Sequence, residues 1–148
     1  MNSKDAAKRA AGIKAIIFDI DGVLTDGAII IDSTGKEIKR FDVQDGTGIK
    51  FLQRAGLIVA FMSGRETKAA DARARELGVT YVYQGCKDKA KAYADFKRVC
   101  SLKDAEIAYV GDDLPDIVVM SSAGLAVAVA NARDEVKAAA QYVTSAAG

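Results

Sequence analysis

Two aspartates and a glycine follow the first apolar run of the sequence. Residues 15–18 form a short run rich in β-branched and aromatic side chains. Asp19 follows this run directly, and Asp21 and Gly22 come just after it. This pattern predicts a strand that carries carboxylates at its C-terminal end, the end at which open α/β sheets bind ligands. Gly22 indicates a turn, which lets both acids converge on one site. Without further signals, an acidic turn after a strand would explain the same residues.

Three later apolar segments end in polar clusters of the same kind. They are residues 57–62 before 63–65, residues 81–83 before 84–89, and residues 107–110 before 111–116. Each cluster opens a predicted helix, and this alternation is typical of a parallel sheet whose carboxyl edge collects the reactive side chains. The clusters add a hydroxyl, lysines and further acids to the pair after the first strand.

The remaining segments predict a single α/β domain over residues 13–148, preceded by a frayed extension over residues 1–12. Helices are expected at about residues 46–55, 66–77, 88–99, 113–122 and 132–140, further strands at 125–129 and 142–143, and a β-hairpin from 28–31 and 37–41. Tyr93, Phe96 and Cys100 recur at helical spacing and should face the core. Pro115 falls in the first turn of its helix, where a missing N–H is tolerated.

Composition excludes several classes of function. The formal charge is +1, and Lys and Arg are interspersed with Asp and Glu, so no nucleic-acid partner is expected. The longest apolar stretch, residues 123–130, is too short to span a bilayer, and residues 1–14 lack the apolar core of a signal peptide. Cys86 and Cys100 are too few for a disulfide framework. We therefore expect a cytoplasmic protein without a membrane partner.

The absence of histidine narrows the chemistry further. The sequence contains none, which excludes Ser-His-Asp hydrolysis, histidine phosphatases and the usual His-ligated zinc sites. A thiol phosphatase would need an arginine six residues after its cysteine, and these positions hold Ala92 and Glu106. Acid–base chemistry must therefore fall to carboxylates, lysine or tyrosine.

The motifs, in this order and spacing, resemble the haloacid dehalogenase (HAD) superfamily of aspartyl phosphotransferases. Within it they are most similar to the cap-less phosphatases of 3-deoxy-D-manno-octulosonate (KDO) 8-phosphate. The resemblance runs from about Ile13 to the last residue and rests on residues 19–26, 41–46, 63–65 with 73, 84–85 with 89, and 111–113. It implies a Rossmann-like three-layer α/β/α fold with a parallel sheet, a β-hairpin flap and no cap domain.

The resemblance implies an Mg²⁺-dependent phosphatase that works through an aspartyl-phosphate. Asp19 would be the nucleophile, and Asp21 would protonate the leaving group and later activate water. Mg²⁺ would be bound by Asp19, the main-chain carbonyl of Asp21 and Asp112, since it prefers oxygen ligands. Asp113 and Asp116 would support these ligands through water or hydrogen bonds without binding the metal themselves. The alternative for the last three acids is a helix start enriched in negative charge.

Two further groups would act on the phosphoryl oxygens. Ser63 and the amide of Gly64 would donate hydrogen bonds to them at a helix N-terminus. Ser63 and Glu66 also fit a capping box, and both roles can hold at once. The resemblance singles out Lys89 among three neighbouring lysines as the cation that stabilises the nucleophile and the transferring phosphoryl group.

Substrate recognition is predicted from two places. Arg65 and Arg73 lie eight residues apart on one predicted helix, so both can face one rim and bind the carboxylate of a sugar acid, although a charged helix surface is the alternative. The resemblance implies that a second segment lines the substrate site: Asp42, Val43, Gln44, Asp45 and Gly46. Gln44 stands where the related phosphatases usually have a basic residue, which leaves the sugar acid open.

The gaps between the motifs leave no room for a cap. The resemblance therefore implies a homotetramer whose hairpins pack together, and Ile29 and Ile31 on the predicted hairpin are compatible with this assembly. Members of the resembled family commonly continue beyond the position of Gly148 with a glycine- and arginine-bearing tail that reaches a neighbouring site.

Three functions follow in order of preference. The first is hydrolysis of KDO 8-phosphate to KDO and phosphate in lipopolysaccharide precursor synthesis. The second is a cap-less phosphatase for another phosphorylated sugar acid, such as a nonulosonate 9-phosphate, which Gln44 makes credible. The third is a signalling receiver domain, which also combines acids, a hydroxyl and a lysine with Mg²⁺. Receivers place the phosphorylated aspartate after a middle strand, whereas Asp19 follows the first.

Overall fold

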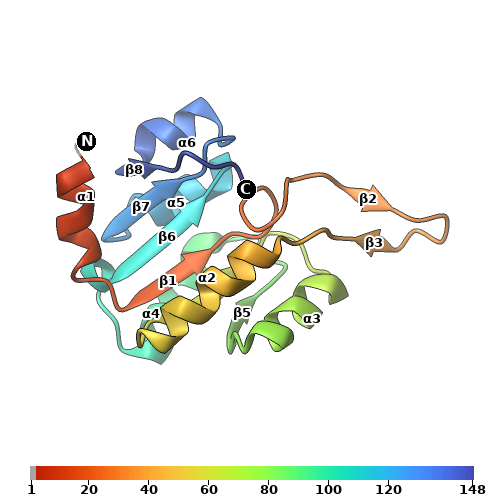
Figure 1. Ribbon diagram of the computed structural model, residues 1–148, viewed down its shortest axis with the longest axis horizontal. Helices are drawn as coiled ribbons and strands as arrows, with labels where there is room; N and C mark the ends of the chain where they lie inside the picture. The colour runs from red at the N-terminus through yellow and green to blue at the C-terminus, as the bar shows by residue number, and fades with distance from the viewer. Residues whose placement is uncertain (1–2) are drawn as a thin grey trace.

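A computed structural model describes residues 3–148 and contains a six-stranded sheet (Figure 1). The strands are β1 (Ala15–Phe18), β4 (Ile58–Met62), β5 (Tyr81–Tyr83), β6 (Ile107–Gly111), β7 (Leu125–Ala128) and β8 (Tyr142–Val143), in the order β5-β4-β1-β6-β7-β8. All pairs are parallel, and Ile17 in β1 lies between Ala60 and Tyr109. β1 therefore lies inside the sheet, and the predicted parallel α/β fold is confirmed.

Helices cover both faces of this sheet (Figure 1). On one face lie α2 (Val43–Arg54) and α3 (Lys68–Leu77), which pack together; on the other lie α4 (Lys89–Cys100), α5 (Ile117–Met120) and α6 (Asp134–Ala139). This is the arrangement that right-handed crossovers require when the strand order reverses after β5. Tyr93 and Phe96 of α4 are buried and Cys100 packs beside them, as their spacing predicted. Among residues 3–148, no helix has the length and apolarity needed to cross a membrane.

The start of the described chain is helical rather than frayed, which corrects one expectation. Helix α1 (Ser3–Ala10) lies against β7, and Ala6 is buried with Ala108 and Leu125. The Arg9 guanidinium also donates a hydrogen bond of 3.0 Å to the Gly124 carbonyl. Ala6 therefore packs on the sheet, whereas Ala7, Ala10 and Ala11 are exposed. Residues 1–2 of the expected extension lie outside the described residues.

The predicted helix at residues 113–122 is split into a short 3₁₀ turn, Leu114–Asp116, and α5. Pro115 lies at the start of this turn, where its missing N–H costs nothing. Asp113 accepts from the Leu114 amide at 2.8 Å, and Asp116 turns its carboxylate back toward the loop. A polar side chain that bonds the preceding amides competes with the regular helical pattern, which explains the difference.

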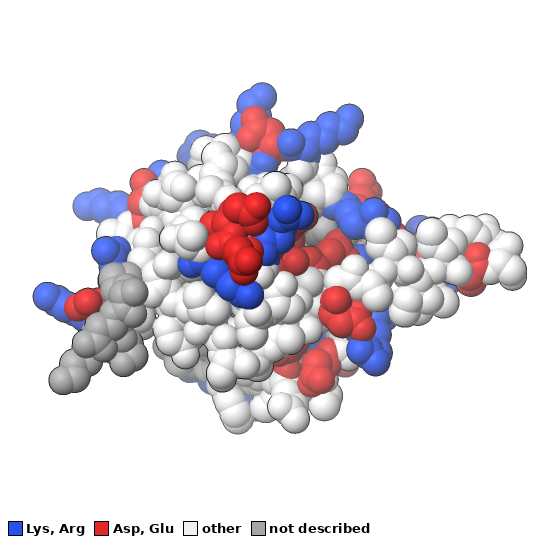
Figure 2. All heavy atoms as spheres, turned by 90° about the horizontal axis from the view of Figure 1, so that it is seen from above, with Lys and Arg blue, Asp and Glu red and all other residues white. Residues whose placement is uncertain are grey.

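The predicted hairpin is present but short: β2 (Ile30–Ile31) pairs in antiparallel fashion with β3 (Glu37–Ile38). Its turn is held by Asp32, which accepts from the amides of Thr34 and Lys36 at 2.8 and 2.9 Å. The hairpin projects from the body of the molecule as an arm (Figure 1 and Figure 2). Ile29 and Ile31 on this arm are 58% and 60% exposed.

Candidate active site

The site is built around Asp19, which follows the inner strand β1. Its amide donates to the Val110 carbonyl at 2.9 Å, which extends the pairing of β1 with β6 and fixes the residue at the carboxyl edge. Its side chain is buried, and its Oδ1 atom accepts from the Lys89 ammonium at 3.0 Å. Lys89 is the first residue of α4, which begins after the N-cap Asp88. The helix start thus brings a cation from 70 residues away to the first motif.

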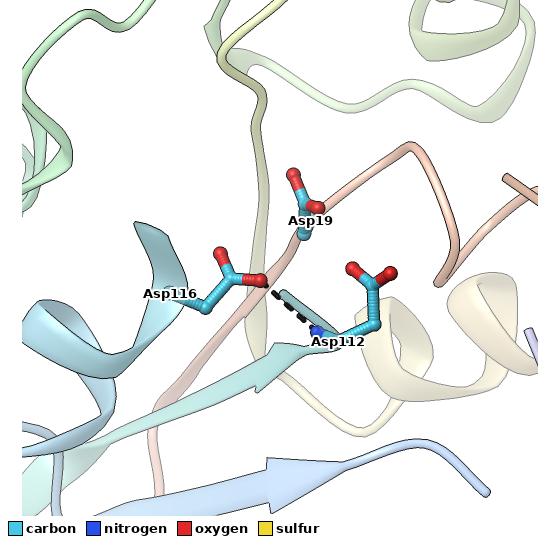
Figure 3. Close-up of side chains that lie close together, drawn as sticks. All are labelled: Asp19, Asp112 and Asp116. Carbon is cyan, nitrogen blue, oxygen red and sulfur yellow. Dashed lines mark hydrogen bonds between the residues drawn. The ribbon is translucent and has the colours of Figure 1, made fainter. Parts of the chain in front are cut away.

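Asp116 is the residue that organises the cluster. Its Oδ1 atom accepts from the Lys89 ammonium and from the Tyr109 hydroxyl, both at 2.6 Å. Its Oδ2 atom accepts from the amides of Asp112 and Asp113 at 3.0 and 3.1 Å. These four bonds occupy both oxygens, so Asp116 fixes the loop that carries Asp112 (Figure 3). Asp116, which was predicted to support the metal ligands, is thus buried against the loop of Asp112, whereas Asp113, predicted with it, is exposed.

The donors fit a divalent cation bound by oxygen. Carboxylate oxygens of Asp19, Asp112 and Asp116 lie within 4.8 Å of one another. Asp112 Oδ1 is buried and has no hydrogen-bond partner among residues 3–148, which is costly for a carboxylate unless a cation takes that place. Gly22 has a φ of +94°, and a Cβ there would lie 2.0 Å from Asp112 Oδ2. Only glycine lets the turn after Asp21 approach Asp112 so closely.

The charges in this cluster also call for a cation. Burial raises the pKa of Asp19 to about 8, and the negative charge of Asp116 adds to this effect while Lys89 opposes it. Burial raises the pKa of Asp112 to about 6, and the negative charge of Asp116 is the second cause of this rise. Burial works against the charge of Lys89, but Asp19 and Asp116 more than compensate and raise its pKa. One ammonium therefore faces three acids, and Mg²⁺ would stabilise the ionised form of Asp19.

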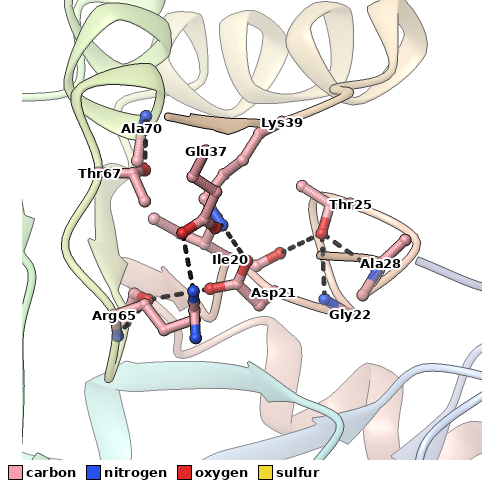
Figure 4. Close-up of polar contacts among 12 residues, drawn as sticks. Ile20, Asp21, Gly22, Thr25, Ala28, Glu37, Lys39, Arg65, Thr67 and Ala70 are labelled. Carbon is pink, nitrogen blue, oxygen red and sulfur yellow. Dashed lines mark hydrogen bonds and ion pairs between the residues drawn. The ribbon is translucent and has the colours of Figure 1, made fainter. Parts of the chain in front are cut away.

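Asp21 lies beside this cluster and is held from two sides (Figure 4). Its Oδ2 atom accepts from the Ser63 hydroxyl at 3.3 Å, and its Oδ1 atom pairs with the Lys39 ammonium. Lys39 also pairs with Glu37 at 2.8 Å, and Glu37 pairs with Arg65 at 2.7 Å. Four of these residues form a chain that runs from the first motif across β3 to the loop after β4: Asp21, Lys39, Glu37 and Arg65.

The structure corrects two predictions about the segment after β4. Helix α3 begins at Lys68, with Thr67 as its N-cap accepting from the Ala70 amide at 3.2 Å, so Ser63 and Glu66 do not form a capping box. Ser63 Oγ instead accepts from the Arg65 amide at 3.0 Å. Arg65 therefore lies in the loop before α3, and it does not share a helix with Arg73. A buried Ser63 directly after β4 leaves its hydroxyl at the carboxyl edge.

Arg73 joins α3 to the start of α2. Its guanidinium donates to the Asp42 carbonyl at 2.8 Å, pairs with Glu76 at 2.9 Å and lies over the Phe41 ring, 5.8 Å from its centroid. A Cβ at Gly46 would lie 2.5 Å from this group, so a larger residue there would displace the guanidinium from its present contacts. The side chain is 15% exposed.

A cavity of about 510 Å³ lies next to the N-terminus of α2. Three of the five predicted substrate residues line it, namely Asp42, Gln44 and Asp45, together with Arg40 and the loop residues 24–26. Val43 is exposed and Gly46 is buried outside this lining. Neither Asp19 nor Lys89 lines the cavity. Its lining includes the loop residues 24–26, which follow the first motif, and residues 146–148.

Comparison with known proteins agrees with this geometry. A family model for haloacid dehalogenase-like hydrolases matches residues 82–147. The 3-deoxy-D-manno-octulosonate 8-phosphate phosphatase of Yersinia pestis is 43% identical over 140 residues, which cover 95% of this chain and 75% of the relative. The phosphatase of the same name from Escherichia coli K12 is 41% identical over 146 residues, covering 99% and 78%. The chain belongs to the KDO 8-phosphate phosphatase family of the HAD superfamily.

Solved structures of related proteins have the same fold as this KDO 8-phosphate phosphatase family member. A Moraxella catarrhalis phosphatase of that name, in complex with magnesium, phosphate and KDO, superposes with a TM-score of 0.97 at 37% identity, covering 99% of this chain and 84% of the other. A HAD subfamily III A hydrolase from Legionella pneumophila gives a TM-score of 0.96 at 43% identity, covering 98% and 80%. Residues 3–148 contain no cap domain, as the spacing of the motifs predicted.

Sequence reasoning missed three residues that this family member places at its site: Tyr109, Lys39 and Glu37. Tyr109 lies inside the buried strand β6, where a hydroxyl needs a partner, and that is the signal that could have found it. Glu37 begins β3 and Lys39 directly follows this strand, so the extended backbone puts both side chains on one face. An acidic and a basic residue at alternate positions are the signal that could have found this pair.

Proposed function

We infer that this protein is an Mg²⁺-dependent phosphatase that hydrolyses KDO 8-phosphate to KDO and phosphate. Its curated relatives carry that activity in their names, and one related structure holds magnesium, phosphate and KDO. The observation that carries the inference is the buried pair of Asp19 and Lys89 beside the unpartnered Asp112 oxygen. A carboxylate nucleophile needs this combination, because it must approach a phosphoryl group of the same charge.

The chain's own side chains divide the reaction between them. A carboxylate oxygen of Asp19 attacks phosphorus, and Lys89 holds that carboxylate in place. Asp21 gives a proton to the leaving alkoxide, then takes one from the water that attacks the aspartyl-phosphate, which releases phosphate and restores Asp19. Ser63 Oγ and the Gly64 amide donate to the phosphoryl oxygens. Mg²⁺ bound by Asp19, Asp112 and the carbonyl of Asp21 supplies charge neutralisation and orients the phosphoryl group.

The sugar-acid part of the substrate is assigned to residues around the loop that follows β1. The cavity beside α2 offers Gln44 and Asp45 as hydrogen-bonding partners for sugar hydroxyl groups. Arg65 is 47% exposed and is the more accessible of the two predicted arginines, so we assign the substrate carboxylate to it. Arg73 would act on the substrate indirectly, through the position of residues 42–46.

We further propose that the active form is a cytoplasmic homotetramer whose hairpins pack together, and that its reaction serves lipopolysaccharide precursor synthesis. A short, isolated hairpin with exposed isoleucines is marginal in water, which favours a partner for it. Residues of neighbouring subunits would then cover the sites in place of a cap.

A substrate screen tests the proposed function. Released phosphate is measured with Mg²⁺ for KDO 8-phosphate, a nonulosonate 9-phosphate and simple sugar phosphates, with Asp19→Asn as the matched inactive control. We expect the highest kcat/KM with KDO 8-phosphate. A preference for the nonulosonate ester would establish the alternative substrate. Stable phosphorylation by a small phosphodonor, without turnover, would identify a receiver-like domain and overturn the phosphatase proposal.

A further inference from the structure

The side chain of Lys39 is unusual for a residue of an exposed arm. It follows β3 of the hairpin directly, yet it is only 3% exposed. Its ammonium faces two carboxylates, Asp21 of the first motif and Glu37 of the hairpin. An ammonium out of water is stable only when carboxylates or other acceptors replace its hydration. The hairpin thus sends one buried cation to the carboxylate that carries protons in the proposed mechanism.

The two oxygens of Asp21 have different partners, and this difference matters for catalysis. Oδ2 accepts from Ser63, whose hydroxyl is also the group that would bind a phosphoryl oxygen. A bound phosphoryl group would therefore compete for Ser63 and free Oδ2. Oδ1 keeps its ion pair with Lys39. The contact with Lys39 is the one that can hold Asp21 in a fixed direction while its other oxygen handles the proton.

Glu37 completes the arrangement from the far side of Lys39. Its two carboxylate oxygens separately bind Lys39 at 2.8 Å and Arg65 at 2.7 Å, and its side chain is 18% exposed (Figure 4). This orients Lys39 toward Asp21 and ties β3 to the loop that carries Ser63 and Arg65. By contrast, Lys36 on the same hairpin is exposed, and its main-chain amide bonds Asp32 within the turn.

We propose that Lys39 is a positioning residue for the proposed phosphatase reaction, which it serves by fixing Asp21 Oδ1 so that Oδ2 faces the leaving group and the attacking water. The inference rests on the proposed function. It assigns to the hairpin a role in proton transfer in addition to its proposed packing role. Lys39 itself exchanges no proton and touches no phosphoryl oxygen.

The test compares two leaving groups in the full chain with Mg²⁺. The alkoxide of KDO 8-phosphate needs a proton as it leaves, whereas p-nitrophenolate does not. In Lys39→Met we expect turnover of KDO 8-phosphate to fall roughly 10²-fold, the range of a general acid that is lost or misplaced. The first-turnover release of p-nitrophenolate should change by less than about threefold, because that step depends little on Asp21. Lys36→Met is the matched control and should behave as wild type.

An equal loss on both substrates would overturn the proposal, since it would mean that Lys39 only maintains the fold of the hairpin. Wild-type turnover of both substrates would overturn it as well. Sedimentation and thermal melting of each variant accompany the kinetics. If Lys39→Met does not fold, Lys39→Arg keeps the charge but moves the donor, and the same dependence on the leaving group is expected with a loss of about tenfold.

The result is separable from the proposed substrate. The comparison requires only an alkyl phosphate that the wild-type protein hydrolyses. If KDO 8-phosphate is not turned over but another sugar phosphate is, the proposed substrate is wrong, and the ratio of the two leaving groups still decides the role of Lys39.

Discussion

The acid cluster and the hairpin arm lie next to each other, yet they are stabilised in different ways. Asp19, Lys89 and Asp116 are 1–6% exposed and are fixed by hydrogen bonds from the sheet, α4 and the loop after β6. The arm has two residues in each strand, and its isoleucines face solvent. The fold of the single chain is therefore sufficient to build the cluster. The arm is connected to the site by ion pairs of Lys39 with Asp21, Glu37 with Arg65 and Arg40 with Asp26.

This difference indicates a division of work. The cluster carries charges whose positions must be set before substrate arrives, so it lies inside the sheet where relaxation is small. The arm carries apolar surface that a monomer leaves in water, so its final position depends on what covers it. Substitutions in the cluster should therefore change chemical steps, and substitutions of the exposed isoleucines of the arm should change substrate binding and assembly.

The largest effect is expected for Asp19→Asn, which keeps the shape of the side chain and removes the nucleophile. Turnover should fall by at least about 10⁴-fold, because loss of a covalent nucleophile leaves only binding and electrostatic contributions. Released phosphate measures the loss, and circular dichroism verifies the fold. Near-normal turnover by a folded variant would exclude the aspartyl-phosphate mechanism.

Asp21→Asn should have the next largest effect, because it removes a proton carrier used in both half-reactions. We expect a loss of roughly 10²–10⁴-fold with an alkyl phosphate. With p-nitrophenyl phosphate the first half-reaction should survive, so the aspartyl-phosphate should accumulate and be trapped by rapid quench. Dephosphorylation at the wild-type rate in that experiment would contradict the assigned role.

Gly22→Ala tests whether the acid cluster binds Mg²⁺ through Asp112. The new Cβ would collide with Asp112 Oδ2, and the residue would keep a positive φ that strains alanine. Displacement of a metal ligand should weaken Mg²⁺ binding about 10- to 100-fold, which activity measured against Mg²⁺ concentration detects. Gly35→Ala is the control, because Gly35 also has a positive φ but has open space around its Cβ position. An unchanged Mg²⁺ dependence in Gly22→Ala would argue against Asp112 as a ligand.

The smallest effect on chemistry is expected for the exposed isoleucines of the arm. Replacing Ile29 and Ile31 with lysine should dissociate the proposed tetramer and raise KM about tenfold, about 1.4 kcal/mol of lost binding, with a smaller change in kcat. Sedimentation velocity and steady-state kinetics measure the two effects. Sedimentation of the unmodified protein as a fully active monomer at assay concentration would refute the assembly.

Much of the fold and the cluster was predictable because it follows from local rules. Apolar runs followed by acids, a serine or lysines place these residues at one edge of a parallel sheet, and the structure brings Asp19, Asp112 and Asp116 together there. Lys89 lies with them, but only the family resemblance distinguished it from the neighbouring lysines. The start of α3 was not predictable in the same way. Ser63 and Thr67 can each cap a helix, and Thr67 is selected by its bond to Ala70 and by its contact with Gln84 from the loop after β5.

The sequence by itself determined the order of strands and helices and the residue types that gather at the carboxyl edge, because side-chain periodicity and turn chemistry are local properties of the chain. Only the tertiary structure decided which partner each charge takes. Lys39 pairs with Asp21 across 18 residues, Arg73 closes on Asp42 across 31, and Asp116 bonds the loop it follows. These choices depend on desolvation, and a charge loses its water only when other elements pack over it.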